Sequence, residues 1–239
     1  MTSPRDEILG GVRSALGRGL LDPSRQAELR ARMAAHRRNL IPARATALDP
    51  SARLDLFVAM AEAVQASVAR LQSSAEIPDE VARYLADENL PAELKMAPDP
   101  DLERLPWEKW PLLRISRGPA EAGDAVGLTP CFAGIAETGT LMLVSGTATP
   151  TTLNFLPDTH IAVVRADQVV ASYEDGWDRL RAAAPGGGAA LPRTVNFVTG
   201  PSRTGDIEQR IVLGAHGPRR LHIILVEDQQ DTEDGQASR

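Results

Sequence analysis

The feature that most constrains the fold is the alternation, from Asp49 onward, between helical patterns and short β patterns. The clearest β signal is the run LHIILVE, which is continuously apolar and therefore typical of a strand buried on both faces of a parallel sheet. The predicted helices cover residues 49–64, 78–85, 172–184 and 204–213, and the predicted strands cover residues 67–71, 94–97, 126–135, 140–145, 160–164, 194–199 and 221–227. This alternation predicts an α/β fold.

The first 45 residues differ from the rest of the chain in charge. They carry nine arginines and four acidic residues, whereas the whole chain of 239 residues has a net charge of −6. Two helices are predicted here, because proline directly follows Ser3 and Asp22. Arginines spread around helices with almost no aromatic residues are more typical of a solvated face or a subunit contact than of an RNA site. We expect a basic helical arm (1–45), an α/β domain (49–228) and a disordered acidic tail (229–239).

Composition excludes several classes of protein. The acidic balance argues against a broad nucleic-acid or anionic-membrane surface. The single cysteine, Cys131, excludes an internal disulfide framework, a multi-cysteine zinc site and an iron–sulfur cluster held by this chain alone. The absence of HExxH or similar spacing predicts no metal site. No apolar run approaches the roughly 20 residues of a membrane span, and the N-terminus lacks a signal-peptide pattern, so we expect a cytoplasmic protein.

The first candidate functional segment is GIAETGTLMLVSG at residues 134–146. Glu137 lies with Thr138, Gly139 and Thr140 at the start of an apolar strand. The glycine allows a close approach to the backbone, the hydroxyls and amides can bind an anion, and the carboxylate can act as base, nucleophile or ligand. The alternative is structural, with Glu137 capping a turn and pairing with an arginine such as Arg203.

The second candidate segment is TGPSRTGDIEQRIVLGAHGP at residues 199–218. A strand, a glycine turn and a predicted helix would place free backbone amides around an anion, and Arg203 adds a guanidinium that suits a carboxylate or phosphate. The alternative is helix capping by Ser202 or Thr204, with Asp206 and Glu208 in the first turn. The spacing matches neither a P-loop nor a GxGxxG motif.

The histidines and the cysteine offer few further candidates. His160 is a weaker candidate for proton transfer, because it follows the polar segment PTTLNFLPDT. His216 is interpreted as a C-terminal helix cap, and His36 and His222 as structural residues. Cys131 lies in an apolar strand with no basic residue nearby, which indicates a buried and unreactive thiol.

Taken together, the two candidate segments, NFLPDTHIAVV and the region of Trp107 resemble the LUD-domain family, in particular its lactate-utilisation C group. The resemblance covers roughly residues 54–227, and a helical arm over residues 8–40 is also typical of the family. Glu137 and Thr138 match the family's AETGT turn, and Ser202, Arg203, Thr204, Asp206 and Glu208 match its SRTxDIE signature. The resemblance implies a three-layer α/β/α sandwich like that of the NagB, ribose-5-phosphate isomerase and CoA-transferase superfamily.

The resemblance also implies a role in the oxidation of L-lactate to pyruvate in bacteria, together with two iron–sulfur or cysteine-rich partner proteins. The clusters are expected in the partners, and no cofactor is expected in this chain. One hypothesis is that Arg203 and the amides from Ser202 hold the organic acid while Glu137 or His160 handles a proton. A second is a non-catalytic assembly or regulatory factor. A third is a stand-alone CoA-transferase-like or sugar-phosphate enzyme, since the glutamate of the AETGT turn invites comparison with a CoA-transferase nucleophile, although fold analogy does not establish function.

Overall fold

The computed structural model describes residues 3–17, 19, 21–38, 40–184, 191–207, 210–214 and 216–228. The chain divides into two compact units, residues 1–41 and residues 42–239. The predicted acidic tail (229–239) and Glu208 lie outside the described residues.

The first unit contains two helices, α1 (Pro4–Ala15) and α2 (Pro23–Ala35). The side chains of Ser3 and Asp22 cap their first turns by accepting hydrogen bonds from backbone amides, and proline occupies the first helical position of each. No described residue of either helix is buried. The capping residues therefore specify the two helices, although neither helix has a buried side chain among its described residues.

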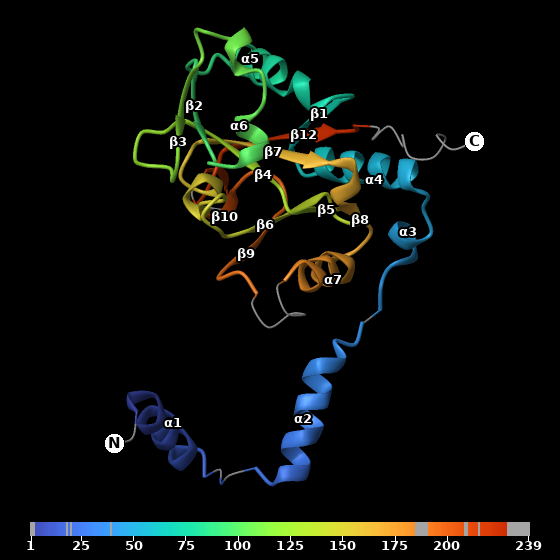
Figure 1. The fold of residues 1–239 in the computed structure, drawn as a ribbon, viewed down its shortest axis with the longest axis vertical. Coiled ribbons are helices and arrows are strands. Elements are labelled where there is room, and N and C mark those ends of the chain that lie inside the picture. The colour runs from blue at the N-terminus through green and yellow to red at the C-terminus, as the bar shows by residue number, and fades with distance from the viewer. Residues whose placement is uncertain are drawn as a thin grey trace, which may run out of the picture. The chain divides into compact units, whose positions relative to one another are not determined.

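The second unit is built on a six-stranded, fully parallel sheet with the order β1-β12-β7-β4-β2-β3 (Figure 1). Its strands are β1 (Ser67–Leu71), β2 (Glu93–Met96), β3 (Arg114–Arg117), β4 (Val126–Pro130), β7 (Thr159–Arg165) and β12 (Arg220–Val226). The three central strands β12, β7 and β4 are almost entirely buried, as continuous apolar runs require. Because all six strands are parallel, their carboxyl ends share one edge of the sheet and their amino ends share the other.

One face of this sheet is covered by α5 (Ile77–Asp87) and α6 (Pro100–Glu103). Side chains of α5, among them Val81 and Leu85, form a continuous core with Ile161 of β7 and Ile224 of β12. Apolar residues four positions apart on α5 lie on one side of the helix, and this spacing is the amphipathic pattern from which the helix is predicted.

The opposite face is covered by α4 (Pro50–Ala63) and by a second sheet, with α7 (Tyr173–Ala183) packed on the outside of that sheet (Figure 1). The second sheet has the order β8-β5-β6-β9. Its strands are β5 (Ala133–Ile135), β6 (Thr140–Val144), β8 (Val169–Val170) and β9 (Val195–Val198). The remaining short elements of this unit are α3 (Ala43–Thr46) and the 3-10 helices η1 (Ser74–Glu76), η2 (Trp107–Lys109), η3 (Thr151–Asn154) and η4 (Ala166–Gln168).

The structure confirms the predicted α/β class with helices on both faces of a parallel sheet. The polar edge strand β3 and the two-residue strand β8 were not predicted. Among the described residues, no helix has both the length and the hydropathy that crossing a membrane requires.

The helix predicted over residues 204–213 is wrong. The segment forms two antiparallel strands, β10 (Arg203–Ile207) and β11 (Arg210–Leu213), and the amide of Gly214 closes them by donating to the carbonyl of Ser202 at 2.9 Å. Three of its apolar residues are β-branched, and β-branched side chains favour strands over helices. The interpretation of His216 as a C-terminal helix cap is therefore also wrong, because the helix that it would cap is absent.

Candidate functional site

The two candidate segments meet at the C-terminal end of α4. Gly139 has a φ of +62°, and a Cβ atom there would lie 2.2 Å from the amide nitrogen of Ala61. Gly200 has a φ of +73°, and a Cβ atom there would lie 2.3 Å from the carbonyl oxygen of Val64. Both positions therefore require glycine, for backbone conformation and for space. Residues some sixty positions apart are held side by side because each packs against the same helix end.

A cluster of hydroxyl groups links the two segments. The Oγ1 atom of Thr140 is 2.7 Å from that of Thr138 and 2.7 Å from that of Thr199. The Oη atom of Tyr173, from the start of α7, lies 3.0 Å from both Thr138 and Thr140. Thr140 is fully buried. Each hydroxyl can donate one hydrogen bond and accept two, so the cluster is internally satisfied.

Glu137 lies apart from this cluster. Its amide donates to the carbonyl of Ala171 at 3.1 Å, and its carbonyl accepts a hydrogen bond from Arg44 at 2.7 Å. Its carboxylate forms no hydrogen bond or ion pair within the described part of the chain. The suggested pairing of Glu137 with Arg203 does not occur, because the guanidinium of Arg203 donates to the end of α4.

A cavity of about 360 Å³ lies at the amino edge of the large sheet, beside the second candidate segment. We call it the amino-edge cavity. It brings together three of the predicted residues, His160, Ser202 and Arg203, with Thr199 of the hydroxyl cluster. Its full lining is Asn154, Phe155, His160, Phe197, Val198, Thr199, Gly200, Pro201, Ser202, Arg203, His216, Gly217, Pro218 and Leu221. No carboxylate is among these residues, so the local charge favours an anion.

His160 forms part of the wall of this cavity and is completely buried. Its Nε2 atom is 2.7 Å from Oγ1 of Thr129 on the neighbouring strand β4. Its Nδ1 atom is buried and has no hydrogen-bond partner among the described residues. Burial lowers the pKa of the imidazole to about 4, so the ring is neutral at pH 7. A buried polar atom without a partner costs free energy.

Ser202 and Arg203 are held by bonds other than those of the predicted helix N-terminus. The amide of Ser202 donates to the carbonyl of Pro218 at 2.8 Å, and its Oγ atom accepts from the amide of His216 at 3.3 Å. The Ser202 hydroxyl is left with its own proton to donate. The guanidinium of Arg203 donates to the carbonyl of Val64 at 3.1 Å and to Oε1 of Gln65 at 3.3 Å. Arg203 therefore supports the loop and contributes positive charge beside the cavity.

The other predicted residues of this segment are placed as follows. Thr204 pairs with Val212 in the β10-β11 ladder, Asp206 lies within β10, and Glu208 lies outside the described residues. The proposed row of free helix amides does not exist, because strands replace the helix.

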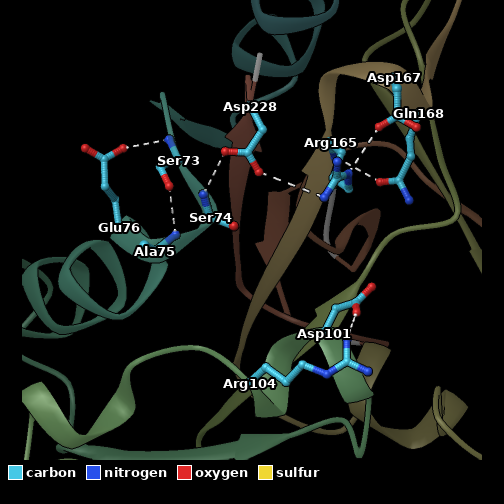
Figure 2. Close-up of polar contacts among 10 residues, drawn as sticks. All are labelled: Ser73, Ser74, Ala75, Glu76, Asp101, Arg104, Arg165, Asp167, Gln168 and Asp228. Atoms are coloured by element: carbon cyan, nitrogen blue, oxygen red, sulfur yellow. Dashed lines mark hydrogen bonds and ion pairs between the residues drawn. The ribbon is translucent and has the colours of Figure 1, made fainter. Parts of the chain in front are cut away.

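A larger cavity, of about 560 Å³, lies at the carboxyl edge of the large sheet, and we call it the carboxyl-edge cavity. Its walls come from residues at or just beyond the ends of β1, β2, β4, β7 and β12, and Figure 2 shows the polar contacts around it. Ligands of open α/β sheets bind at this edge. Sequence reasoning missed its two arginines, Arg104 and Arg165. The position of Arg165 at the end of a predicted strand was a usable signal, but the strand order was needed to bring the two segments together.

Comparison with known proteins decides the family. The family model of the LUD domain matches residues 54–226, which include both candidate segments. The chain belongs to the LUD-domain family. A crystal structure of a DUF162 family protein from Deinococcus radiodurans superposes with a TM-score of 0.55 at 26% sequence identity, covering 75% of this chain and 99% of that one.

Curated relatives of this LUD protein carry the name lactate utilization protein C. The relative from Deinococcus radiodurans is 39% identical over 113 residues, which are 47% of this chain and 50% of the relative. Those from Halalkalibacterium halodurans and Bacillus subtilis are 37% and 36% identical over 46% and 42% of their lengths, and over 46% and 43% of this chain. The matches thus span half or less of the curated relatives.

Other titratable groups of the LUD domain have structural roles. His222 is buried, with Nδ1 2.8 Å from Oγ of Ser67 and Nε2 3.0 Å from Oε1 of Glu80, as its structural interpretation predicted. Cys131 is buried, as predicted, and burial raises the pKa of its thiol to about 12, which opposes formation of the reactive thiolate. The described residues contain no cluster of three or more His, Cys, Asp or Glu side chains suited to a metal ion.

Proposed function

We propose that this protein takes part in lactate utilisation in the cytoplasm and binds a small 2-hydroxy or 2-oxo acid in the amino-edge cavity. The names of the relatives support the pathway. The observation that carries the site is His160, which lines a cavity with no carboxylate among its lining residues and whose buried Nδ1 atom has no hydrogen-bond partner among the described residues.

The chemistry of this cavity suits both members of the lactate–pyruvate pair. When Nε2–H of the neutral His160 donates to Thr129, Nδ1 accepts a hydrogen bond from the hydroxyl group of a 2-hydroxy acid. In the other tautomer, Nδ1–H donates to the carbonyl oxygen of a 2-oxo acid. The Ser202 hydroxyl and the positive charge of Arg203 favour the carboxylate of either acid.

Electron transfer is assigned to the partners. Oxidation of L-lactate to pyruvate releases two electrons and two protons, and the single cysteine of this chain cannot by itself hold an iron–sulfur cluster. We assign the electrons to clusters in two iron–sulfur or cysteine-rich partner subunits. Glu137 is not among the residues that line the amino-edge cavity, but its carboxylate has no partner in the described structure, so it is kept beside His160 as a candidate proton carrier.

The binding experiment is titration calorimetry of the full chain with L-lactate and with pyruvate. His160→Gln and Ser202→Ala should each weaken binding by about tenfold or more, because each removes a hydrogen bond to a charged or polar ligand. Ser116→Ala, on the distant edge strand β3, is the matched control and should bind as the wild type does. Circular dichroism checks the fold of each variant. Equal affinity of all four proteins would overturn the site.

The activity experiment is L-lactate-dependent dye reduction by the two partner subunits, with and without this chain. Turnover should require the wild-type chain and fail with Glu137→Gln if Glu137 carries a proton. Full activity of the Glu137→Gln protein would remove Glu137 from the reaction. Turnover that proceeds without the chain would leave assembly or regulation as its role.

The helical arm favours assembly as a second candidate function. Ile8, Val12 and Leu16 follow one side of α1, with exposed fractions of 67%, 49% and 59%, in a segment rich in arginine. The helix α1 itself carries two arginines and two acidic residues, but the arm as a whole is basic, and an exposed apolar stripe on such an arm is suited to an acidic partner surface. Ile8→Asp with Val12→Asp should abolish co-purification with the partner subunits and leave lactate binding unchanged. Leu112→Asp, an exposed leucine of the LUD domain, is the control.

A further inference from the structure

The carboxyl-edge cavity has no role in the proposed binding of lactate. It lies at the opposite edge of the sheet from His160, and its volume of about 560 Å³ is within the range of sites for drug-sized ligands. Its walls include apolar side chains from several elements, namely Ile77, Leu102, Leu105, Phe132, Val144, Val163 and Val226. A six-heavy-atom hydroxy acid such as lactate has only one methyl group, which is too little apolar surface to cover these walls. The cavity therefore calls for a larger and partly apolar occupant.

Arg165 is fixed at this cavity by acidic neighbours. Its Nε atom donates to Oδ1 of Asp167 at 3.2 Å, and its Nη1 atom lies 3.9 Å from Oδ2 of Asp228 (Figure 2). The same carboxylate of Asp228 accepts a hydrogen bond from the amide of Ser74 at 3.1 Å. A guanidinium has five N–H donors, and these contacts leave several of them for a ligand. The two aspartates thus orient the Arg165 side chain and leave some of its N–H donors available to a ligand.

Arg104 supplies a second guanidinium to the lining, from the C-terminal end of α6. Among the described residues it pairs only with Asp101, at 2.9 Å, and the two side chains are 74% and 85% exposed. An ion pair this exposed contributes little free energy, so Arg104 can exchange Asp101 for a ligand at small cost. The cavity combines apolar walls with one oriented and one adaptable guanidinium, and its lining also holds two carboxylates, of which Asp99 caps α6 and Asp101 pairs with Arg104. Planar guanidinium groups are suited to phosphate and carboxylate oxygens.

We propose that the carboxyl-edge cavity binds an amphipathic organic phosphate, with its apolar ring system against the cavity walls and its phosphate at Arg165 and Arg104. The proposal goes beyond lactate binding and does not rest on it, because no residue lines both cavities.

The experiment compares four probes on the full chain: FMN, riboflavin, AMP and inorganic phosphate. FMN and riboflavin share a ring system and differ by the phosphate, so their comparison isolates the role of the arginines. FMN fluorescence and calorimetry should show binding, riboflavin should bind at least about tenfold more weakly, and phosphate alone should not bind measurably. Binding of AMP in place of FMN supports the same site with a smaller ring.

Two variants locate the site. Arg165→Gln should reduce the affinity for FMN to that for riboflavin. Ala75→Trp should abolish binding, because Ala75 lines the cavity yet is exposed, so that the larger side chain fills space without disturbing the core. Arg181→Gln is the control, since Arg181 pairs with Asp178 and lines neither cavity.

Three results would overturn the proposal. They are no binding of either FMN or AMP, equal affinities for FMN and riboflavin, and nucleotide binding that survives both Arg165→Gln and Ala75→Trp. Failure of the lactate site is distinguished by His160→Gln, which should leave the binding of FMN unchanged.

Discussion

The buried hydrogen bond between Glu80 and His222 provides a sharp test of the energetics of the LUD domain. Glu80 is 8% exposed and His222 is 2% exposed, and the histidine ring is stacked on Tyr84 with 4.0 Å between ring centroids. Arg83 donates two further hydrogen bonds to the same carboxylate. Burial opposes the ionisation of Glu80, but the hydrogen bonds from His222 and Arg83 outweigh it and lower its pKa to about 2.

The magnitude and sign of the effect follow from this pKa. The ordinary value is 4.5, and each pH unit between 4.5 and about 2 is equivalent to about 1.4 kcal/mol, so ionised Glu80 contributes about 3 kcal/mol to the free energy of unfolding. Since the pKa is lowered in the folded state, the contribution is present above about pH 4.5 and is lost as the pH falls toward about 2. Glu80→Gln keeps the shape of the side chain and removes the titration. The variant should be less stable by about 3 kcal/mol at pH 7.

Urea unfolding, followed by tryptophan fluorescence at a series of pH values from 7 to 2, measures the free energy of unfolding of the wild type and of Glu80→Gln as a function of pH. The difference between wild type and Glu80→Gln should shrink below about pH 4.5 and vanish near pH 2. Glu88→Gln is the matched control, because Glu88 pairs with Arg220 at 3.1 Å with both side chains about 40% exposed, and its loss should cost no more than about 1 kcal/mol. Parallel curves for wild type and Glu80→Gln over the whole range would refute the reasoning.

Two further predictions concern packing. Gly139→Ala should lower the free energy of unfolding by about 2 to 5 kcal/mol, because the new side chain sits on a left-handed backbone and its Cβ atom clashes with α4. Gly118→Ala is the control: it is also at positive φ, but no atom lies within 4 Å of its Cβ position, so it should cost only the backbone strain. Equal losses of stability in urea unfolding would contradict the clash. Since burial raises the pKa of the Cys131 thiol to about 12, the folded protein at pH 8 should react with a disulfide reagent far more slowly than the urea-unfolded protein; equal rates would show an accessible thiolate.

The strands that could be predicted from the sequence are the buried ones, because burial on both faces requires apolar residues along the whole strand. β7 and β12 are continuous apolar runs, because helices or a second sheet cover both of their faces. β3 has the sequence RISR and lies at the edge of the sheet with mostly exposed side chains, so nothing in its composition distinguishes it from a loop. β8 has two residues, which is too short for any periodicity.

The error over residues 204–213 shows why a short apolar pattern is ambiguous. Ile207, Ile211 and Val212 have a spacing close to one helical turn, and this spacing outweighed their β-branched side chains in the prediction. In the structure, β10 and β11 change register between Thr204 and Ile207. A β-bulge of this kind interrupts the period of two by which a regular hairpin is recognised in a sequence.

The residues that carry the family resemblance divide into two groups by what they contact. Gly139 and Gly200 are required by the close approach of the end of α4, whereas the side chains of His160, Ser202 and Arg203 line the amino-edge cavity, and Arg203 also donates to the end of α4. Sequence reasoning named members of both groups, but it could not separate them, because the separation depends on which element each segment meets in space. The first group should respond to substitution chiefly through stability, and the second chiefly through ligand affinity. In these family segments, some residues therefore fix a loop to the end of α4, and only the remaining residues are available to a ligand.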